Sequence, residues 1–200
     1  MRPLLLDLFC GAGGAAMGYD RAGFDVVGVD IKRQPRYPFP FIQGDALAPP
    51  VDLAAFDAIH ASPPCQAWTR AQHRDDHLHL IEPVRRRLVE AGIPWVIENV
   101  PGAPVDGVLL CGADFGLPII RHRVFETSWW IGLVPTACGG ADPSSHRGFA
   151  PYARGNWRPK WRRSVMPAVW PWMGTLAEAS EAIPPAYTEW IGRQLLARVR

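Results

Sequence analysis

The chain has 200 residues, 48% of them hydrophobic, and a formal net charge of +2. This length and composition predict a single domain around one sizeable core. No apolar run approaches the roughly 20 residues that a membrane-spanning helix needs, and the N-terminal MRPLLLDLFCGAGG turns polar too early for a signal peptide, so we expect a soluble, cytoplasmic protein. Four widely spaced cysteines without a CxxC pair indicate neither a disulfide framework nor a zinc ribbon, and we expect free thiols.

Hydrophobic patterning predicts strands that alternate with helices. Strand patterns occur at residues 3–8, 25–30, 41–45, 56–62 and 94–100, and helical spacing at 15–24 and at 78–92, where Gly92 ends the helix. Further sheet elements are predicted at 108–118 and 123–132. Regular periodicity is lost from 135 to 171; a capping-box pattern, TLAE, follows at 175–178, and an amphipathic helix that begins with proline is predicted at 185–200.

This alternation predicts an α/β fold with a mostly parallel sheet, helices on both faces, and a ligand crevice at the carboxyl ends of the strands. Gly11 and Gly13 follow the first strand and Asp30 ends the second. Such glycines let the backbone approach a ligand closely, while the carboxylate can hold a ribose diol, which indicates a nicotinamide, a flavin or S-adenosylmethionine, unless the turn is purely structural. Asp45, after the third strand, is either an adenine contact or an ordinary turn residue.

Two further side chains are expected at the same rim of the sheet. Cys65 follows Pro63 and Pro64 in SPPCQ, an exposed loop position that suits a thiolate nucleophile, although an isolated cysteine is more often a small buried hydrophobe. Glu98 emerges from the apolar strand PWVI, where a carboxyl group can have a raised pKa and act as a proton donor, or be a strand-end residue without a special role. Asn99 beside it could satisfy backbone groups of the loop.

Together these motifs resemble the DNA cytosine-5 methyltransferases. DLFCGAGG, PPCQ and ENV are similar to motifs of that family, ADFGLPIIRHRVF at 113–125 resembles its arginine motif, and AIPPAYTEWIG at 182–192 resembles its last motif. The resemblance implies a Rossmann-like S-adenosylmethionine-dependent methyltransferase fold. It assigns a set of residues to S-adenosylmethionine: Phe9, Gly11, Gly13, Asp30, Asp45, Pro64 and Pro184.

The resemblance also implies the chemistry and its catalytic residues. Cys65 would add to carbon 6 of cytosine, Glu98 would bind or protonate nitrogen 3, Arg123 would contact the exocyclic oxygen, and Arg121 would steady the site or a phosphate. Because the target atoms are stacked inside double-stranded DNA, the nucleotide would have to be flipped out of the duplex. Gln66 and Asn99 are implied to contact the substrate.

A short segment stands where the family has a long target-recognition domain. We predict a catalytic core at 1–128, a basic and aromatic DNA-contacting insertion at 129–174, and a C-terminal helix at 175–200 that returns to the core. Within the insertion, cations alternate with aromatics, as expected for phosphate contacts and base stacking, although a loop packed on the body is the alternative. The predicted DNA contacts are Arg154, Trp157, Arg158, Trp161 and Arg162.

This compactness predicts a phage-type or solitary modification enzyme, of the kind found in restriction-modification, that reads a very short sequence. A dimer mate or partner protein that assists recognition stays an alternative. The family's glutamine is replaced by Ile119, and the asparagine before the last motif is absent, so an ordering hydrogen bond is in question at each place.

Other interpretations remain open from the sequence. The HRDDHLH stretch has residue types that bind metals, but no framework fixes them, and we expect no metal site there. An RNA cytosine-5 methyltransferase and a non-catalytic nucleic-acid-binding relative are the alternative functions. A nicotinamide oxidoreductase would leave PPCQ, ENV and RHR without a reason.

Overall fold

The computed structural model describes residues 1–65, 79–132 and 165–199. Its centre is a seven-stranded sheet in the order β3-β2-β1-β4-β5-β7-β6. The strands are β1 (Leu4–Leu8), β2 (Asp25–Asp30), β3 (Phe41–Gln43), β4 (Ala58–Ala61), β5 (Trp95–Asn99), β6 (Val108–Leu110) and β7 (Arg123–Thr127). Strands β3, β2, β1, β4 and β5 pair in parallel, whereas β7 runs antiparallel to both β5 and β6. The chain therefore has the predicted Rossmann-like methyltransferase fold.

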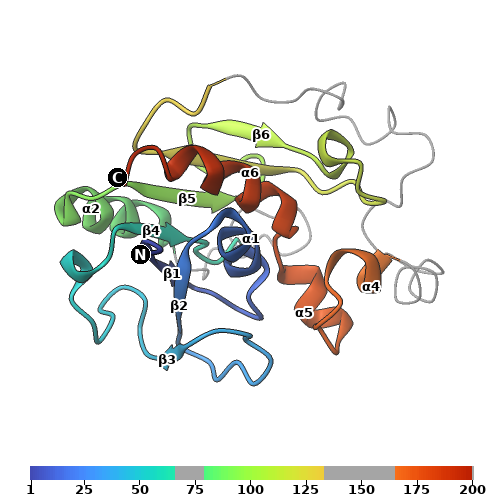
Figure 1. The fold of residues 1–200 in the computed structure, drawn as a ribbon, viewed down its shortest axis with the longest axis horizontal. Helices are drawn as coiled ribbons and strands as arrows, with labels where there is room; N and C mark the ends of the chain where they lie inside the picture. Colours follow the sequence, from blue (N-terminus) through green and yellow to red (C-terminus); the bar gives the residue numbers. More distant parts are fainter. Residues whose placement is uncertain (66–78, 133–164, 200) are drawn as a thin grey trace.

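Helices cover both faces of this sheet (Figure 1). On one face, α1 (Gly14–Ala22) packs against α6 (Pro185–Leu195), and on the other, α2 (Ile81–Ala91) packs near β5. Successive side chains of a strand point to opposite faces, so Leu5 joins the core under α1 and α6 while Leu6 joins the core under α2. Both faces are buried, which explains why the parallel strands read as near-continuous apolar runs.

The sequence signals for helix ends are confirmed at two helices. Gly92 ends α2 in the left-handed conformation, with φ of 70°. Thr175 and Glu178 form the predicted capping box, which starts α5 (Leu176–Glu181). A short helix, α4 (Met166–Val169), lies within the stretch where regular periodicity is lost, because four residues are too few to show a helical repeat.

Two predicted sheet elements are shorter than their patterns. Of residues 108–118, only β6 is a strand; a 3₁₀ helix, η3 (Gly112–Phe115), follows, where Asp114 accepts the Cys111 N–H at 2.9 Å and Gly112 lies against the carbonyl of Ile119. Strand β7 ends at Thr127 because its partner β5 begins at Trp95, whose carbonyl accepts the Ser128 N–H. A second 3₁₀ helix, η1 (Leu53–Ala55), precedes β4.

Within the described residues, no helix is long and apolar enough to cross a membrane. Cys10, Cys65 and Cys111 carry free thiols, as expected; Cys138 lies outside the described residues.

Asp7, in the middle of β1, is fully buried on the face that α1 covers. Burial raises the pKa of its carboxyl group to about 8; the neighbouring charge of Asp30 adds to this rise, and a 3.4 Å hydrogen bond from the Tyr37 hydroxyl opposes it. In the unfolded chain the same group would lose its proton near pH 4. Unfolding therefore releases a proton between pH 4 and 8, and stability falls as the pH rises through that window.

We expect Asp7→Asn to unfold with a higher free energy than the wild type at pH 8. The difference should shrink by at most about 1.4 kcal/mol per pH unit toward pH 4 and level off below it, where both side chains are neutral in both states. Urea unfolding at several pH values measures this. Asp52→Asn, which changes an exposed cap of η1, is the control and should keep the wild-type pH dependence; an equal dependence in Asp7→Asn would contradict the assignment.

Candidate active site at the carboxyl edge of the sheet

The carboxyl ends of the parallel strands bring the predicted site residues to one edge. The glycine turn follows β1, Asp30 ends β2, Cys65 follows β4, and Glu98 lies at the end of β5. Because β7 is antiparallel to β5, its first residue, Arg123, lies at this same edge. The sheet topology therefore explains why an arginine that begins a strand meets a glutamate that ends one.

The turn after β1 has a backbone built for close approach of a ligand. Gly11 and Gly13 have φ of 49° and 85°, and Phe9 has φ of 58°, a conformation that non-glycine residues rarely adopt. A Cβ at Gly11 would have no neighbour within 4 Å, so this backbone borders open space. The turn is fixed to β2, since the Gly11 N–H donates to Asp30 Oδ2 at 3.0 Å.

The Asp30 carboxylate is held in place while part of its hydrogen-bonding capacity remains. Its Oδ1 accepts the Lys32 N–H at 2.8 Å, so each oxygen takes one backbone donor. A carboxylate can accept about four hydrogen bonds, and two adjacent hydroxyl groups would suit the remaining lone pairs. Asp45 Oδ1 accepts the Leu47 N–H at 2.9 Å, as a turn residue does, and its adenine contact stays a prediction.

The segment that resembles the family's last motif lies against the glycine turn. A Cβ at Gly14 would come within 2.4 Å of the Ile183 carbonyl, so only glycine permits this contact. The Trp172 indole also donates to the Ala12 carbonyl at 2.9 Å. Pro184, assigned to the cofactor from sequence, is the residue before α6 and therefore stands beside this corner.

Cys65 is half-buried, four residues beyond the end of β4. Asn99 anchors its loop, because Asn99 Nδ2 donates to the Pro63 carbonyl at 2.9 Å and Asn99 Oδ1 accepts the Val100 N–H at 3.0 Å. Of the two roles raised for Asn99, the structure shows the backbone contact; a contact with substrate stays a prediction.

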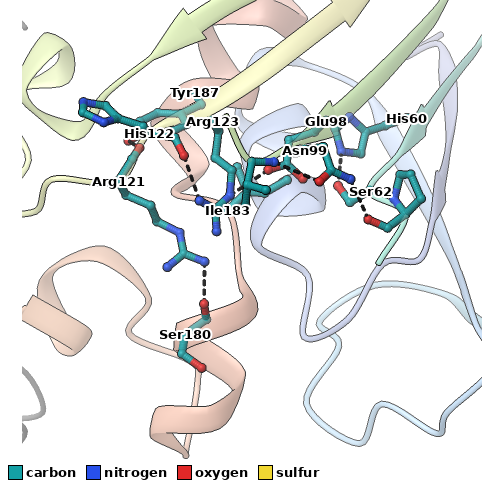
Figure 2. A network of polar contacts seen from close by, with 12 residues as sticks. His60, Ser62, Glu98, Asn99, Arg121, His122, Arg123, Ser180, Ile183 and Tyr187 are labelled. Atoms are coloured by element: carbon teal, nitrogen blue, oxygen red, sulfur yellow. Dashed lines mark hydrogen bonds and ion pairs between the residues drawn. The ribbon is translucent and has the colours of Figure 1, made fainter. Parts of the chain in front are cut away.

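Glu98 and Arg123 form a buried ion pair beside this loop, with 2.8 Å between Glu98 Oε1 and Arg123 Nε. Arg123 also donates to the His122 carbonyl at 2.8 Å, which holds the guanidinium group in position (Figure 2). Burial raises the pKa of the Glu98 carboxyl, although Arg123, Arg121 and a hydrogen bond with Ser62 lower it in part.

The ionisations of Cys65 and Glu98 are linked. Burial raises the pKa of the Cys65 thiol, the charge of Arg123 lowers it, the negative charge of Glu98 raises it, and Arg121 lowers it. When Glu98 takes up a proton, its negative charge disappears, while the cations that favour a thiolate remain. Protonation of Glu98 would therefore lower the pKa of the Cys65 thiol, and ionisation of Cys65 would raise the pKa of the Glu98 carboxyl.

Arg121 extends away from Glu98 toward the C-terminal helices (Figure 2). Its Nη2 donates to the Ser180 carbonyl at 2.6 Å, its guanidinium carbon lies 5.7 Å from the centre of the Trp170 ring, and its own carbonyl accepts the Tyr187 hydroxyl at 2.6 Å. These contacts join the arginine motif to α5 and α6. The steadying role that the resemblance assigned to Arg121 stays a prediction.

Sequence reasoning missed a polar group behind Glu98. His60 is fully buried in β4; its Nε2 lies 2.8 Å from Ser62 Oγ and its Nδ1 lies 3.0 Å from the Tyr19 hydroxyl. Figure 2 shows His60 and Ser62 beside Glu98 and Asn99. The sequence feature that could have revealed this group is a histidine inside an apolar strand. A buried polar side chain needs hydrogen-bonding partners, so such a histidine predicts polar groups nearby.

Several predicted residues lie outside the described residues. They are Gln66, His73, Asp76, His77, Arg154, Trp157, Arg158, Trp161 and Arg162. Among the residues that the structure does describe, no group of three or more histidine, cysteine, aspartate or glutamate side chains could hold a metal ion.

No family model matches the chain, but comparison with known proteins finds type II methyltransferases among its relatives. The chain is 27% identical to the type II methyltransferase M.AquIA of Picosynechococcus, over 62% of this chain and 71% of that protein. It is 27% identical to the type II methyltransferase M1.HphI of Haemophilus parahaemolyticus, over 60% of this chain but only 44% of that protein. A solved prophage-encoded E. coli protein described as a DNA modification methyltransferase is 26% identical over 62% of this chain and 45% of that one, with a TM-score of 0.48.

The two curated relatives are both type II methyltransferases. The chain is a homologue of the type II DNA methyltransferases.

Proposed function

We propose that this protein transfers a methyl group from S-adenosylmethionine to carbon 5 of cytosine in DNA. The observation that carries the proposal is the half-buried Cys65 thiol beside the buried Glu98–Arg123 pair, on the same sheet edge as the glycine turn and Asp30. A nucleophile, a proton donor and a cation at one rim are the groups that cytosine activation needs.

The corner formed by Phe9, Gly11, Gly13 and Asp30 fits S-adenosylmethionine. Asp30 would accept the ribose hydroxyls, and the positive-φ turn would let the backbone approach the amino acid part of the molecule. Pro64, Pro184 and Asp45 are proposed to complete its surroundings. When bound, S-adenosylmethionine supplies an electrophilic methyl group on a sulfonium centre.

The side chains at the rim would make carbon 5 reactive. The Cys65 thiolate adds to carbon 6, forming a carbon–sulfur bond and pushing electrons toward nitrogen 3, where Glu98 supplies a proton or a hydrogen bond. Arg123, held by Glu98 and His122, is placed to contact the exocyclic oxygen of the same ring. After carbon 5 is methylated, loss of its proton breaks the bond to Cys65 and restores the aromatic ring.

Access to a stacked cytosine requires the nucleotide to leave the helix, at a cost of a few kcal/mol. We propose that the segment 129–174 contributes this step and most of the DNA affinity, because residues 147–163 carry six cations and two tryptophans. A dimer mate or a partner protein would be needed only if this segment fails to bind DNA. The site of action would be the cytoplasm of a bacterium or of a phage-infected host.

Salt dependence separates these two sources of affinity. Replacing Arg158, Arg162 and Arg163 together by glutamine should reduce the slope of log affinity against log salt concentration by about 2.7, at roughly 0.9 per lost phosphate contact on duplex DNA. Equilibrium binding to a DNA duplex at four salt concentrations measures the slope. A matched triple change at the exposed Arg86, Arg87 and Arg198 is the control. A wild-type slope in the first variant would assign recognition to a partner.

The activity itself is tested with tritiated S-adenosylmethionine and genomic DNA, followed by nucleoside chromatography. We expect the label in 5-methylcytosine. Label in N4-methylcytosine or N6-methyladenine would overturn the proposal, and label that enters only added transfer RNA would favour the RNA-directed alternative.

A further inference from the structure

A continuous row of hydrogen-bonding groups runs from α1 through β4 to Glu98. The Tyr19 hydroxyl lies 3.0 Å from His60 Nδ1, and His60 Nε2 lies 2.8 Å from Ser62 Oγ. The Ser62 hydroxyl in turn hydrogen-bonds Glu98. Tyr19 and His60 are fully buried, so the row runs through the interior of the protein toward the active site.

The chemistry of these groups fixes the direction of every donor when Glu98 is ionised. A carboxylate only accepts, so Ser62 must donate to it; Ser62 Oγ then accepts from His60 Nε2–H, and His60 Nδ1 accepts from the Tyr19 hydroxyl. His60 is neutral in this arrangement, because complete burial lowers its pKa to about 3. A neutral imidazole has one N–H and one acceptor nitrogen, which matches its two partners.

We infer that the row Tyr19–His60–Ser62 is a polarised hydrogen-bond relay that orients Glu98 and favours its ionised form, with His60 and Ser62 as positioning residues. The inference rests on the proposed function for the role of Glu98, but the relay itself is a property of the folded protein. Hydrogen bonds that point the same way polarise one another, so the far end at Tyr19 contributes to the strength of the bond at Glu98.

Other groups around Glu98 and His60 do not replace the relay. Arg123 faces Glu98 from β7, and Arg121 and Cys65 act on it electrostatically; Ser62→Ala removes none of these groups. Asp7 is the neighbour of His60 on β1 in the strand register. Its raised pKa, about 8, makes it neutral at pH 7, so it does not favour a charged imidazole there.

The relay predicts that Ser62→Ala raises the pKa of Glu98, because a donor to the ionised form is lost. We expect a rise of about one pH unit in Ser62→Ala and a smaller rise in the same direction in Tyr19→Phe, which removes only the distant hydroxyl. Ser62→Thr keeps a hydroxyl group and should restore the wild-type value. The readout is the carboxyl carbon-13 signal of labelled glutamate, titrated between pH 3 and 10 and assigned with Glu98→Gln.

Ser128→Ala is the matched control, since Ser128 Oγ accepts the Trp95 N–H at the opposite end of β5. It should leave the Glu98 titration unchanged.

A single-turnover methylation assay should show methyl transfer slowed about tenfold in Ser62→Ala, because Glu98 loses a donor that orients it. The affinity for S-adenosylmethionine should stay at the wild-type value, and Ser62→Thr should recover the rate.

The titration tests the relay, and the methylation assay of the wild type tests the proposed function, so the two proposals can be contradicted separately. An identical Glu98 pKa in wild type, Ser62→Ala and Tyr19→Phe would overturn the relay, whatever the activity. Absence of methyl transfer by the wild type would contradict the proposed function, while the titration would still decide whether the relay acts on Glu98.

Discussion

Cys65→Ser should abolish methyl transfer to cytosine while leaving the affinity for S-adenosylmethionine nearly unchanged. The hydroxyl group of serine does not ionise near neutral pH, so addition to carbon 6 stops. The glycine turn and Asp30, which follow β1 and β2, do not depend on the thiol. Filter-based methylation of DNA and equilibrium dialysis with labelled S-adenosylmethionine measure the two properties.

Cys111→Ser is the control for this experiment, because Cys111 is a buried thiol at the start of η3. It should retain activity. Substantial methylation by Cys65→Ser would show that the thiol is not the nucleophile. Only the proposed S-adenosylmethionine site would then remain supported.

Glu98→Gln should lower the single-turnover rate of methylation by about 10²- to 10⁴-fold, the usual contribution of a general acid or base. The amide has no proton of the required acidity to give to nitrogen 3. The same change should make Cys65 more reactive, because the negative charge of Glu98 raises the pKa of that thiol and glutamine removes it. Alkylation of Cys65 by iodoacetamide should therefore reach half its maximum at a lower pH than in the wild type.

These opposite effects separate a chemical role of Glu98 from damage to the site. Glu126→Gln is the matched control: it alters another glutamate–arginine pair, between Glu126 and Arg85 at 2.7 Å, on the neighbouring strand β7. Its methylation rate and its Cys65 alkylation profile should stay close to those of the wild type. Slower methylation and slower alkylation together in Glu98→Gln would point to a distorted loop instead.

The order of elements could be predicted from the sequence because parallel strands and their helices carry strong local signals. The apolar runs PWVI and PLLLDL predict buried strands without reference to distant residues. The left-handed Gly92 and the Thr175 cap are equally local. The direction of β7 could not be predicted from a local signal, because it depends on which sheet edge the chain reaches after η3.

Individual site residues could be predicted only where they belong to a motif that resembles one of the family. Cys65, Glu98 and Arg123 were placed by resemblance, and the fold brings them to one edge. Tyr19 and His60 could not be paired from sequence, because they are 41 residues apart and meet only where α1 packs on β4. Long-range polar contacts of this kind depend on helix packing, which a single sequence does not specify.

Covalent trapping tests the central claim most directly, since Cys65 is proposed to bond to the base itself. Wild-type protein is incubated with S-adenosylmethionine and duplex DNA in which cytosine is replaced by 5-fluorocytosine, which has no carbon 5 proton to lose. We expect a denaturation-resistant protein–DNA adduct, and digestion with mass spectrometry should place the nucleotide on the peptide that contains Cys65. Methylation of normal DNA without any adduct on that peptide would contradict the account.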